Sequence, residues 1–317
     1  MPSAMRNVTL HRLRVFEAVA RLESVSGAAK ELHLTQPAVS MQVKQLEDQV
    51  GLPLTERIGR RIQLTEAGQE VALHARRLAE QLREAEAALD ALKGLRGGRL
   101  SIGVVSTAKY FAPRLLAECQ RLHPEIDLKL AVANRSDVVQ LLAENSIDLA
   151  IMGTPPQHIE CEAERIAAHP MAWLAAPGHP LAALRRVEPA RLAHERLLVR
   201  EPGSGTRSAM DRYLRTHKMA PSQMLEMSSN ETIKQAVMAE MGIAFLSEHT
   251  VGLEVAARRL VRLRVPDTPV MRQWFAVHRT DKRLLPAARA FREFLLRDGA
   301  QLIEEQMAAS PAQRRKG

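Results

Sequence analysis

The sequence predicts an α/β protein in which a helical N-terminal region is followed by one long helix and then by a domain of alternating strands and helices. Three observations lead to this prediction. Residues 24–50 have apolar side chains at helical spacing, residues 66–93 carry an unbroken apolar seam, and strand-length apolar runs begin at Arg99. A chain of 317 residues with 46% hydrophobic residues can form two or three domains with cores of their own.

Residues 24–50 (SVSGAAKELHLTQPAVSMQVKQLEDQV) predict two short helices split by a turn, a helix-turn-helix. Thr35 suits the N-cap of the second helix, and Pro37 falls in its first turn, where a missing N–H costs nothing. A buried stripe continues through Val39, Val43, Leu46 and Val50.

The start of this second helix carries polar side chains that suit DNA. Glutamine can pair with adenine in the major groove, while a helix N-terminus and a lysine suit phosphate. The predicted DNA contacts from this helix are Thr35, Gln36, Pro37, Ser40, Gln42 and Lys44. Of these, Gln36, Ser40, Gln42 and Lys44 are expected to project from one exposed side of the helix. The alternative is an ordinary helical hairpin with a solvated face.

Residues 54–68 (LTERIGRRIQLTEAG) predict two short strands around Gly59 and Arg60. Arg57, Arg60 and Arg61 cluster at the tip, where they can follow a phosphate backbone or reach a minor groove. A recognition helix followed by a basic wing makes double-stranded DNA the predicted partner.

This order of helices and wing resembles the N-terminal domain of the LysR-type transcriptional regulators. The matching residues are Phe16, Ala28, Ala29, Leu32, Thr35, Gln36, Pro37, Ala38, Val39, Ser40, Gln42, Leu46, Glu47, Gly51, Leu54, Arg57, Leu64, Thr65, Ala67 and Gly68. One departure is Thr55, where the family usually has Phe, so we expect thinner packing beneath the wing.

Composition agrees with a polyanionic partner. The net charge is +9, and the first 65 residues hold nine Lys or Arg against six Asp or Glu. Cys119 and Cys161 are too few for a disulfide framework and lack metal-ligand spacing. The N-terminus has no apolar signal core and no run of 18 apolar residues occurs, so we expect a cytoplasmic protein with no membrane contact.

Residues 66–93 predict one long helix whose apolar positions alternate in steps of four and three. The seam is Val71, Ala75, Leu78, Leu82, Ala85, Leu89 and Leu92. Pairing with the same helix of a second chain would bury this seam and fix the separation of two recognition helices. The alternative is packing against the chain's own C-terminal domain.

From Arg99 onward, strands alternate with helices in two groups, which implies a parallel sheet in each. Predicted strands are 100–106, 126–134, 147–153, 171–177, 196–200, 223–227, 242–247 and 270–278, and predicted helices include 113–123, 136–145, 206–217 and 230–240. Two lobes joined by crossing segments resemble the effector domain of the same family, which implies the fold of periplasmic solute-binding proteins. The predicted domains are 1–65 (DNA-binding), 66–94 (linker helix), 95–300 (lobe I at about 99–168 and 274–300, lobe II at about 169–273) and a tail at 301–317.

A ligand is expected between the lobes, where strand C-termini and helix N-termini meet. In EPGSGTR (201–207), unpaired N–H groups at a helix start and an arginine favour an anion. Lys109, Arg135 and Arg207 are expected to give the cleft three cations. The candidate ligand-binding residues are Ser106, Thr107, Lys109, Asn134, Arg135, Gly153, Arg200, Gly205, Thr206, Arg207 and Asn230. Helix capping is the commoner reason for Ser, Thr or Asn at such places.

Three segments, 106–113, 200–207 and 229–247, resemble those of the Calvin-cycle operon regulators, a subgroup that controls the genes for ribulose bisphosphate carboxylase. The resemblance implies control of carbon-fixation genes by a small phosphorylated sugar or nucleotide metabolite, with no cofactor. A regulator of another operon with a non-phosphorylated carboxylate effector is the alternative.

Other classes of protein fit less well. No nucleophile elbow, P-loop or H-E-x-x-H motif is present, so neither catalysis nor a metal is predicted. The two-lobed domain taken alone would also fit a solute-binding protein. The DNA-binding region taken alone would also fit a nucleoid protein without sequence specificity. The expected mechanism is a dimer or tetramer that binds an imperfect inverted repeat in a promoter and changes its DNA contacts when effector closes the cleft. RNA polymerase is a further partner that this mechanism implies.

Overall fold

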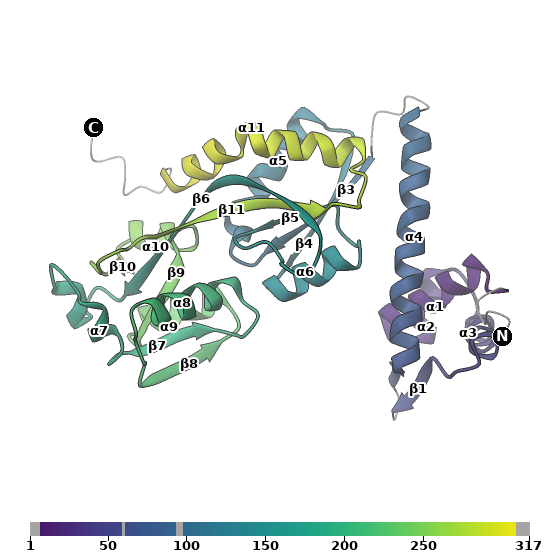
Figure 1. Ribbon diagram of the computed structural model, residues 1–317, viewed down its shortest axis with the longest axis horizontal. Coiled ribbons are helices and arrows are strands. Elements are labelled where there is room, and N and C mark those ends of the chain that lie inside the picture. The colour runs from purple at the N-terminus through teal and green to yellow at the C-terminus, as the bar shows by residue number, and fades with distance from the viewer. Residues whose placement is uncertain (1–6, 59–60, 93–97, 309–317) are drawn as a thin grey trace. The chain divides into compact units, whose positions relative to one another are not determined.

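The computed structural model describes residues 7–58, 61–92 and 98–308. The chain divides into two compact units, one formed mainly by residues up to 94 and one by the rest (Figure 1). Each unit has its own apolar core.

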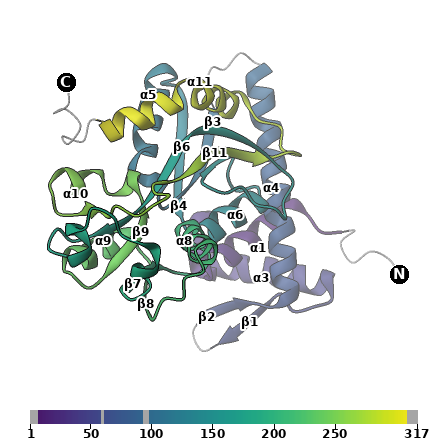
Figure 2. The same cartoon turned by 60° about the vertical axis from the view of Figure 1, so that its left-hand side comes forward.

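The first unit contains the predicted helices and wing. Its elements are α1 (Leu10–Leu22), α2 (Val25–Glu31), α3 (Gln36–Val50), β1 (Thr55–Ile58), β2 (Arg61–Leu64) and α4 (Glu66–Leu92). The predicted N-cap of α3 is present, because the Thr35 hydroxyl accepts the Ala38 N–H at 3.4 Å. Phe16, Leu46 and Leu54 are fully buried at the centre of the unit. Figure 2 shows the β1–β2 hairpin beside the N-terminal end of α4.

A polar anchor holds the start of the wing at Thr55. One oxygen of Glu47 in α3 accepts the Thr55 hydroxyl at 3.1 Å, the Thr55 N–H at 3.0 Å and the Leu54 N–H at 2.9 Å. The threonine therefore ties the first wing strand to the recognition helix by hydrogen bonds, a contact that a phenylalanine side chain could not make.

The second unit is a sheet flanked by helices. Its strands are β3 (Gly98–Val105), β4 (Ile126–Ala133), β5 (Leu149–Met152), β6 (Cys161–Ala175), β7 (Arg196–Arg200), β8 (Gln223–Met227), β9 (Ile243–Ser247), β10 (Val261–Arg262) and β11 (Val270–Arg279). Its helices are α5 (Ala112–Leu122), α6 (Arg135–Ala143), α7 (Pro189–Leu192), α8 (Gly205–Thr216), α9 (Asn230–Met238), α10 (Gly252–Ala256) and α11 (Pro286–Ala308), with 3-10 turns η1 (Ala108–Tyr110), η2 (Pro180–Ala183) and η3 (Glu248–Thr250).

Two long strands connect the lobes of this unit. The strand order is β4-β3-β5-β11-β6-β9-β7-β8, with β10 paired to β6. The outer groups β4-β3-β5 and β9-β7-β8 are parallel, as predicted. The inner strands β6 and β11 are antiparallel to each other and to their neighbours β9 and β5. The predicted strands 171–177 and 270–278 therefore depart from the expected parallel arrangement, because the segments that cross between the lobes are themselves strands of the sheet.

Separate apolar clusters fill the two lobes. Trp274, Phe111 and Phe291 lie in the cluster of the β3-β4-β5 lobe, and Trp173 and Phe245 lie in a cluster of the other. Because β6 and β11 contribute to both lobes, the space between the lobes is lined by residues of these two strands as well as by strand ends.

Candidate functional site

A pocket lies between the two lobes of the second unit, at the ends of β3 and β5 and the start of α8. Its lining residues are Val105, Ser106, Thr107, Arg135, Gly153, Thr154, His169, Ser204, Gly205, Thr206, Arg272 and Trp274. The cavity volume is about 20 Å³, which is enough for one water molecule. A metabolite could enter only if the lobes or the lining side chains moved.

Arg135 is one of two cations at this pocket. It is the first residue of α6, and its guanidinium donates to the carbonyls of Thr154 at 3.0 Å and Pro155 at 3.2 Å. Burial lowers the pKa of Arg135 below its ordinary value. Its hydrogen-bond acceptors are uncharged.

Arg272, in the crossing strand β11, is the second cation. It donates to the carbonyls of Gly153 at 2.9 Å and Gly205 at 3.3 Å, and also to the hydroxyl of Thr154. Burial, and then the charges of Arg212 and Arg135, lower the pKa of Arg272 to about 10. Within the described residues, both pocket arginines donate to carbonyl and hydroxyl oxygens and to no carboxylate, so an anion between them would relieve unfavourable charge.

Hydroxyl groups complete the polar wall. Ser204 caps α8 by accepting the Thr206 N–H at 3.2 Å. The hydroxyls of Thr107 and Thr206 lie 3.4 Å apart across the lobes. The N-terminus of the 12-residue helix α8 therefore opens on a space bordered by two hydroxyls and two guanidinium groups.

The structure brings together only part of the predicted set. Ser106, Thr107, Arg135, Gly153, Gly205 and Thr206 line the pocket, whereas Lys109, Asn134, Arg200, Arg207 and Asn230 do not. Effector binding by any of them remains a prediction. The expected convergence of three cations, Lys109, Arg135 and Arg207, is wrong, because only Arg135 lies at the pocket.

Arg207 is neutralised by acidic neighbours. Its guanidinium contacts Asp211 at 3.1 Å and Glu226 at 3.5 Å, and donates to the Arg200 carbonyl at 2.9 Å. Asp211 lies one turn further along α8, whereas the Arg200 carbonyl belongs to β7 and Glu226 to β8. An uncompensated charge at this position was the wrong expectation.

Lys109 and Arg200 also have structural partners. The Lys109 ammonium lies 5.3 Å from the ring centre of Tyr110, a cation–π distance. Arg200 is buried, forms a two-bond ion pair with Glu201 at 2.7 and 2.8 Å, and donates to Asn230 at 2.7 Å. Asn134 caps α6 by accepting the Asp137 N–H at 3.0 Å. Asn134 therefore has a capping role and Arg200 an ion pair, and Arg200 also donates to the hydroxyl of the pocket residue Ser106 at 3.3 Å.

The sequence pattern did not indicate Thr154, His169, Arg272 and Trp274. The last three lie on the crossing strands β6 and β11, directly beside the pocket. The sequence did contain a signal for Arg272, because this arginine stands inside the mostly apolar strand VMRQWFAVH. A charged residue in such a strand is seldom buried without a partner, which indicates a binding role.

In the first unit, the exposed face of α3 carries Gln36, Pro37, Ser40 and Lys44, as predicted, and the capping Thr35 is also exposed. Gln42 is half-buried. Two residues after Ser40 it is turned by about 200° around the helix, so the expectation that it shares this face is wrong.

The backbone register of β1 and β2 places two of the three wing arginines. Arg57 lies in β1 opposite Ile62, and Arg61 lies in β2 opposite Ile58. Gly59 and Arg60 lie outside the described residues. The predicted hairpin is present, and its DNA contacts remain a prediction.

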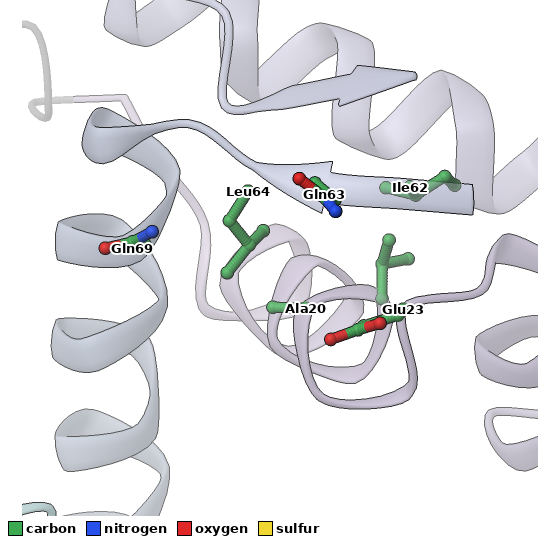
Figure 3. A pocket seen from close by; sticks show the side chains of 7 residues that line it. Ala20, Glu23, Ile62, Gln63, Leu64 and Gln69 are labelled. Carbon is green, nitrogen blue, oxygen red and sulfur yellow. The ribbon is translucent and has the colours of Figure 1, made fainter. Parts of the chain in front are cut away.

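A second cavity, of about 250 Å³, separates the wing strand β2 from α1 and α4 (Figure 3). Its lining residues are Val19, Ala20, Glu23, Ile62, Gln63, Leu64 and Gln69. Leu64 is the strand partner of Thr55, so the cavity lies under the wing where we expect thin packing. Its polar lining side chains are the amides of Gln63 and Gln69 and the carboxylate of Glu23, so among the described residues no positive charge lines it for an anion.

Only the first residues of the predicted α4 seam pack against the core of the first unit. Ala75 is buried and Val71 packs against the core of the first unit. Leu78, Leu82 and Leu89 are exposed. None of the described helices could span a membrane, and the described part of the chain has no group of three potential metal ligands among its His, Cys, Asp and Glu residues.

Comparison with known proteins identifies both units. The family profile described as the LysR substrate binding domain matches residues 93–300. The profile described as the bacterial regulatory helix-turn-helix protein of the lysR family matches residues 10–69.

Relatives match almost the whole chain. The RuBisCO operon transcriptional regulator of Allochromatium vinosum is 50% identical over 93% of this chain and 98% of its own length. The HTH-type transcriptional regulator CfxR of Cupriavidus necator is 47% identical over 96% of each chain. The CcmR regulatory domain of Synechocystis PCC6803, solved in complex with 2-PG, is 35% identical over 63% of this chain and 96% of its own, with a TM-score of 0.60. The chain therefore belongs to the LysR family of bacterial helix-turn-helix regulators.

Proposed function

We propose that the protein regulates transcription of carbon-fixation genes and responds to a small phosphorylated anion bound between the lobes of its second unit. The names of its relatives support the choice of genes. The 2-PG bound by the CcmR domain, which is 2-phosphoglycolate, supports a phosphorylated effector.

The observation that carries the effector proposal is the pair of arginines at the pocket. Arg135 and Arg272 donate only to carbonyl and hydroxyl oxygens, and burial lowers the pKa of each. The N-terminus of α8 adds backbone N–H groups at the same place. A phosphate or carboxylate would accept from all three.

The DNA side of the proposal rests on α3 and the wing. Gln36 and Ser40 would read bases, and Lys44 with the wing arginines would contact phosphates of double-stranded DNA. Two copies joined through α4, as a dimer or within a tetramer, would bind the two halves of an imperfect inverted repeat. A regulator of this kind works where the DNA is, which makes the cytoplasm its proposed location.

The mechanism follows from the size of the pocket. A cavity of about 20 Å³ cannot enclose a phosphorylated metabolite, so in this proposal binding selects an arrangement in which the lobes or the lining side chains lie further apart. The contacts that would change cross between the lobes, such as Thr107 with Thr206. We place the lobe boundaries near residues 169 and 273, inside the crossing strands.

Calorimetry on the full-length protein tests this function. We expect 2-phosphoglycolate to bind, and Arg272→Gln to weaken binding about ten- to a hundredfold, because it removes a charge-assisted contact worth roughly 1.5–3 kcal/mol. Arg207→Gln is the matched control, since Arg207 already has two carboxylate partners, and it should leave the affinity unchanged.

Glycolate separates the two effector classes. If it bound as tightly as 2-phosphoglycolate, the effector would be a carboxylate without phosphate. If Arg207→Gln weakened binding and Arg272→Gln did not, the anion would lie outside this pocket and the proposal would fail.

A further inference from the structure

His169 is a buried side chain of the pocket wall whose polar atoms have no protein partner. It lies in β6, is 3% exposed and lines the pocket. Neither of its ring nitrogens has a hydrogen-bond partner among the described residues. A neutral imidazole has one donor and one acceptor, and native structures seldom leave both unused in a buried position.

His169 and Arg272 border the same space. They are directly opposite in the antiparallel register of β6 and β11, and such partners point to the same face of a sheet. At Gly153, a Cβ atom would lie 2.9 Å from the His169 Nδ1 and 3.4 Å from the Arg272 Nη2. An anion held by Arg272 would therefore lie close to the imidazole.

Aromatic contacts fix the plane of the imidazole. The ring of His169 stacks on Trp274 with centroids 3.9 Å apart and planes within 14°. His249 meets it edge-on at 6.0 Å, and Phe111 meets Trp274 at 5.0 Å. The ring is thus held beside the pocket by packing alone.

Burial and the positive charge nearby disfavour the protonated form of His169. Burial, then the charge of Arg272 on β11, then His249 on η3 lower the pKa of His169 well below its ordinary value. Arg135 of α6 lines the same pocket and adds a second positive charge on that side, and no described carboxylate pairs with His169. An anion beside Arg272 would oppose this positive field and give the imidazole an acceptor for its N–H.

We propose that His169 contacts the bound anion directly and takes up one proton from the solvent when the anion binds. One ring nitrogen donates its N–H to an anion oxygen, and the other nitrogen receives the proton. Effector affinity therefore rises as the pH falls. This inference rests on the proposed function of the pocket.

Sulfate is a suitable probe because it is a dianion that does not titrate near neutral pH. We would measure sulfate affinity of the full-length protein at pH 6, 7 and 8 by the change in tryptophan fluorescence, since Trp274 is stacked on the titrating ring. Wild-type affinity should rise by up to about tenfold for each pH unit, the limit for uptake of one proton. His169→Gln should bind more weakly and with no dependence on pH.

His194→Gln is the matched control, because it removes an exposed imidazole of the second unit that does not line the pocket and has no contact with His169, and it should keep the wild-type pH dependence. His169→Phe keeps the stacking on Trp274 and should lose affinity at every pH, which separates contact with the anion from packing. Equal affinity and pH dependence in wild type and His169→Gln would overturn the inference, and so would sulfate binding that ignores pH in the wild type.

The proposed function fails in a different way. If neither sulfate nor 2-phosphoglycolate bound the wild type, or if Arg272→Gln bound both as tightly, the pocket would not be the anion site. If Arg272→Gln weakened anion binding and His169→Gln did not, the proposed function would stand and only the inference on His169 would fail.

Discussion

Gly153 shows how closely the pocket is fitted at the level of one residue. It directly follows β5, beside the imidazole of His169 and the guanidinium of Arg272, and its own carbonyl accepts from that guanidinium. A Cβ atom 2.9 Å from an imidazole nitrogen is closer than van der Waals contact allows. Because the ring is fixed by stacking on Trp274, it has little freedom to move aside.

We therefore expect Gly153→Ala to weaken 2-phosphoglycolate binding by about tenfold or more, by displacing the groups that face the anion. Gly205→Ala is the control, since a Cβ there would meet only the Arg135 Cδ at 3.8 Å, an ordinary contact. Calorimetry on both variants decides the matter. Equal losses would mean that added bulk anywhere in the cleft is harmful and that Gly153 has no special place.

The residue scale is also where sequence reasoning is weakest. Ser106, Thr107 and Thr206 were predictable, because strand ends and helix starts meet between lobes. Arg207 was not, since its direction depends on Asp211 and on Glu226, which a different strand supplies. Arg272 escaped prediction because the register of β11 against β6, a long-range pairing, decides which of its residues face the cleft.

At the scale of elements, α3 combines a buried stripe with an exposed polar face. Val39, Val43 and Leu46 fix the rotation of the helix by packing in the core. That rotation turns Gln36, Ser40 and Lys44 outward together, because they recur every four residues. The helix therefore presents one narrow face for contact with DNA.

Gln36→Ala should cost roughly 1–3 kcal/mol on the DNA sequence that the protein selects from a random pool, and little on unrelated DNA. Lys44→Ala should weaken binding to both and reduce the salt dependence by about one phosphate contact. Fluorescence anisotropy at several salt concentrations measures both effects. Equal loss on the two DNAs for Gln36→Ala would show that Gln36 does not read bases.

Elements were more predictable than their pairing. Helical spacing located α3 and α4, and apolar runs located β3, β5 and β9, because both depend on nearby residues. The 15-residue strand β6 was expected only over its last five residues, since Cys161 to Ile166 mixes charged and apolar residues. Pairing with β11 supplies the backbone hydrogen bonds that hold the first part of β6 extended.

At the scale of the whole molecule, the exposed part of α4 bears on assembly. The first turns of this helix bury Ala72 and Ala75 in the first unit, so packing within that unit accounts for the start of the seam. Leu78, Leu82 and Leu89 continue the same seam and are exposed, with Leu82 47% accessible. A second copy of the helix offers these leucines an equivalent apolar stripe, since a self-paired seam is the same on both sides.

We therefore expect Leu82→Glu to disrupt the paired state, because it would place two carboxylates against each other in an apolar interface, at a cost of several kcal/mol. Arg77→Gln makes the same change of one charge unit at an exposed position off the seam and should leave assembly intact. Sedimentation velocity should show smaller species for Leu82→Glu alone, with weaker binding to an inverted-repeat DNA, since one recognition helix then binds without its partner. If Leu82→Glu kept the wild-type mass and DNA affinity, the copies would have to be joined elsewhere and the leucines of α4 would have no part in assembly.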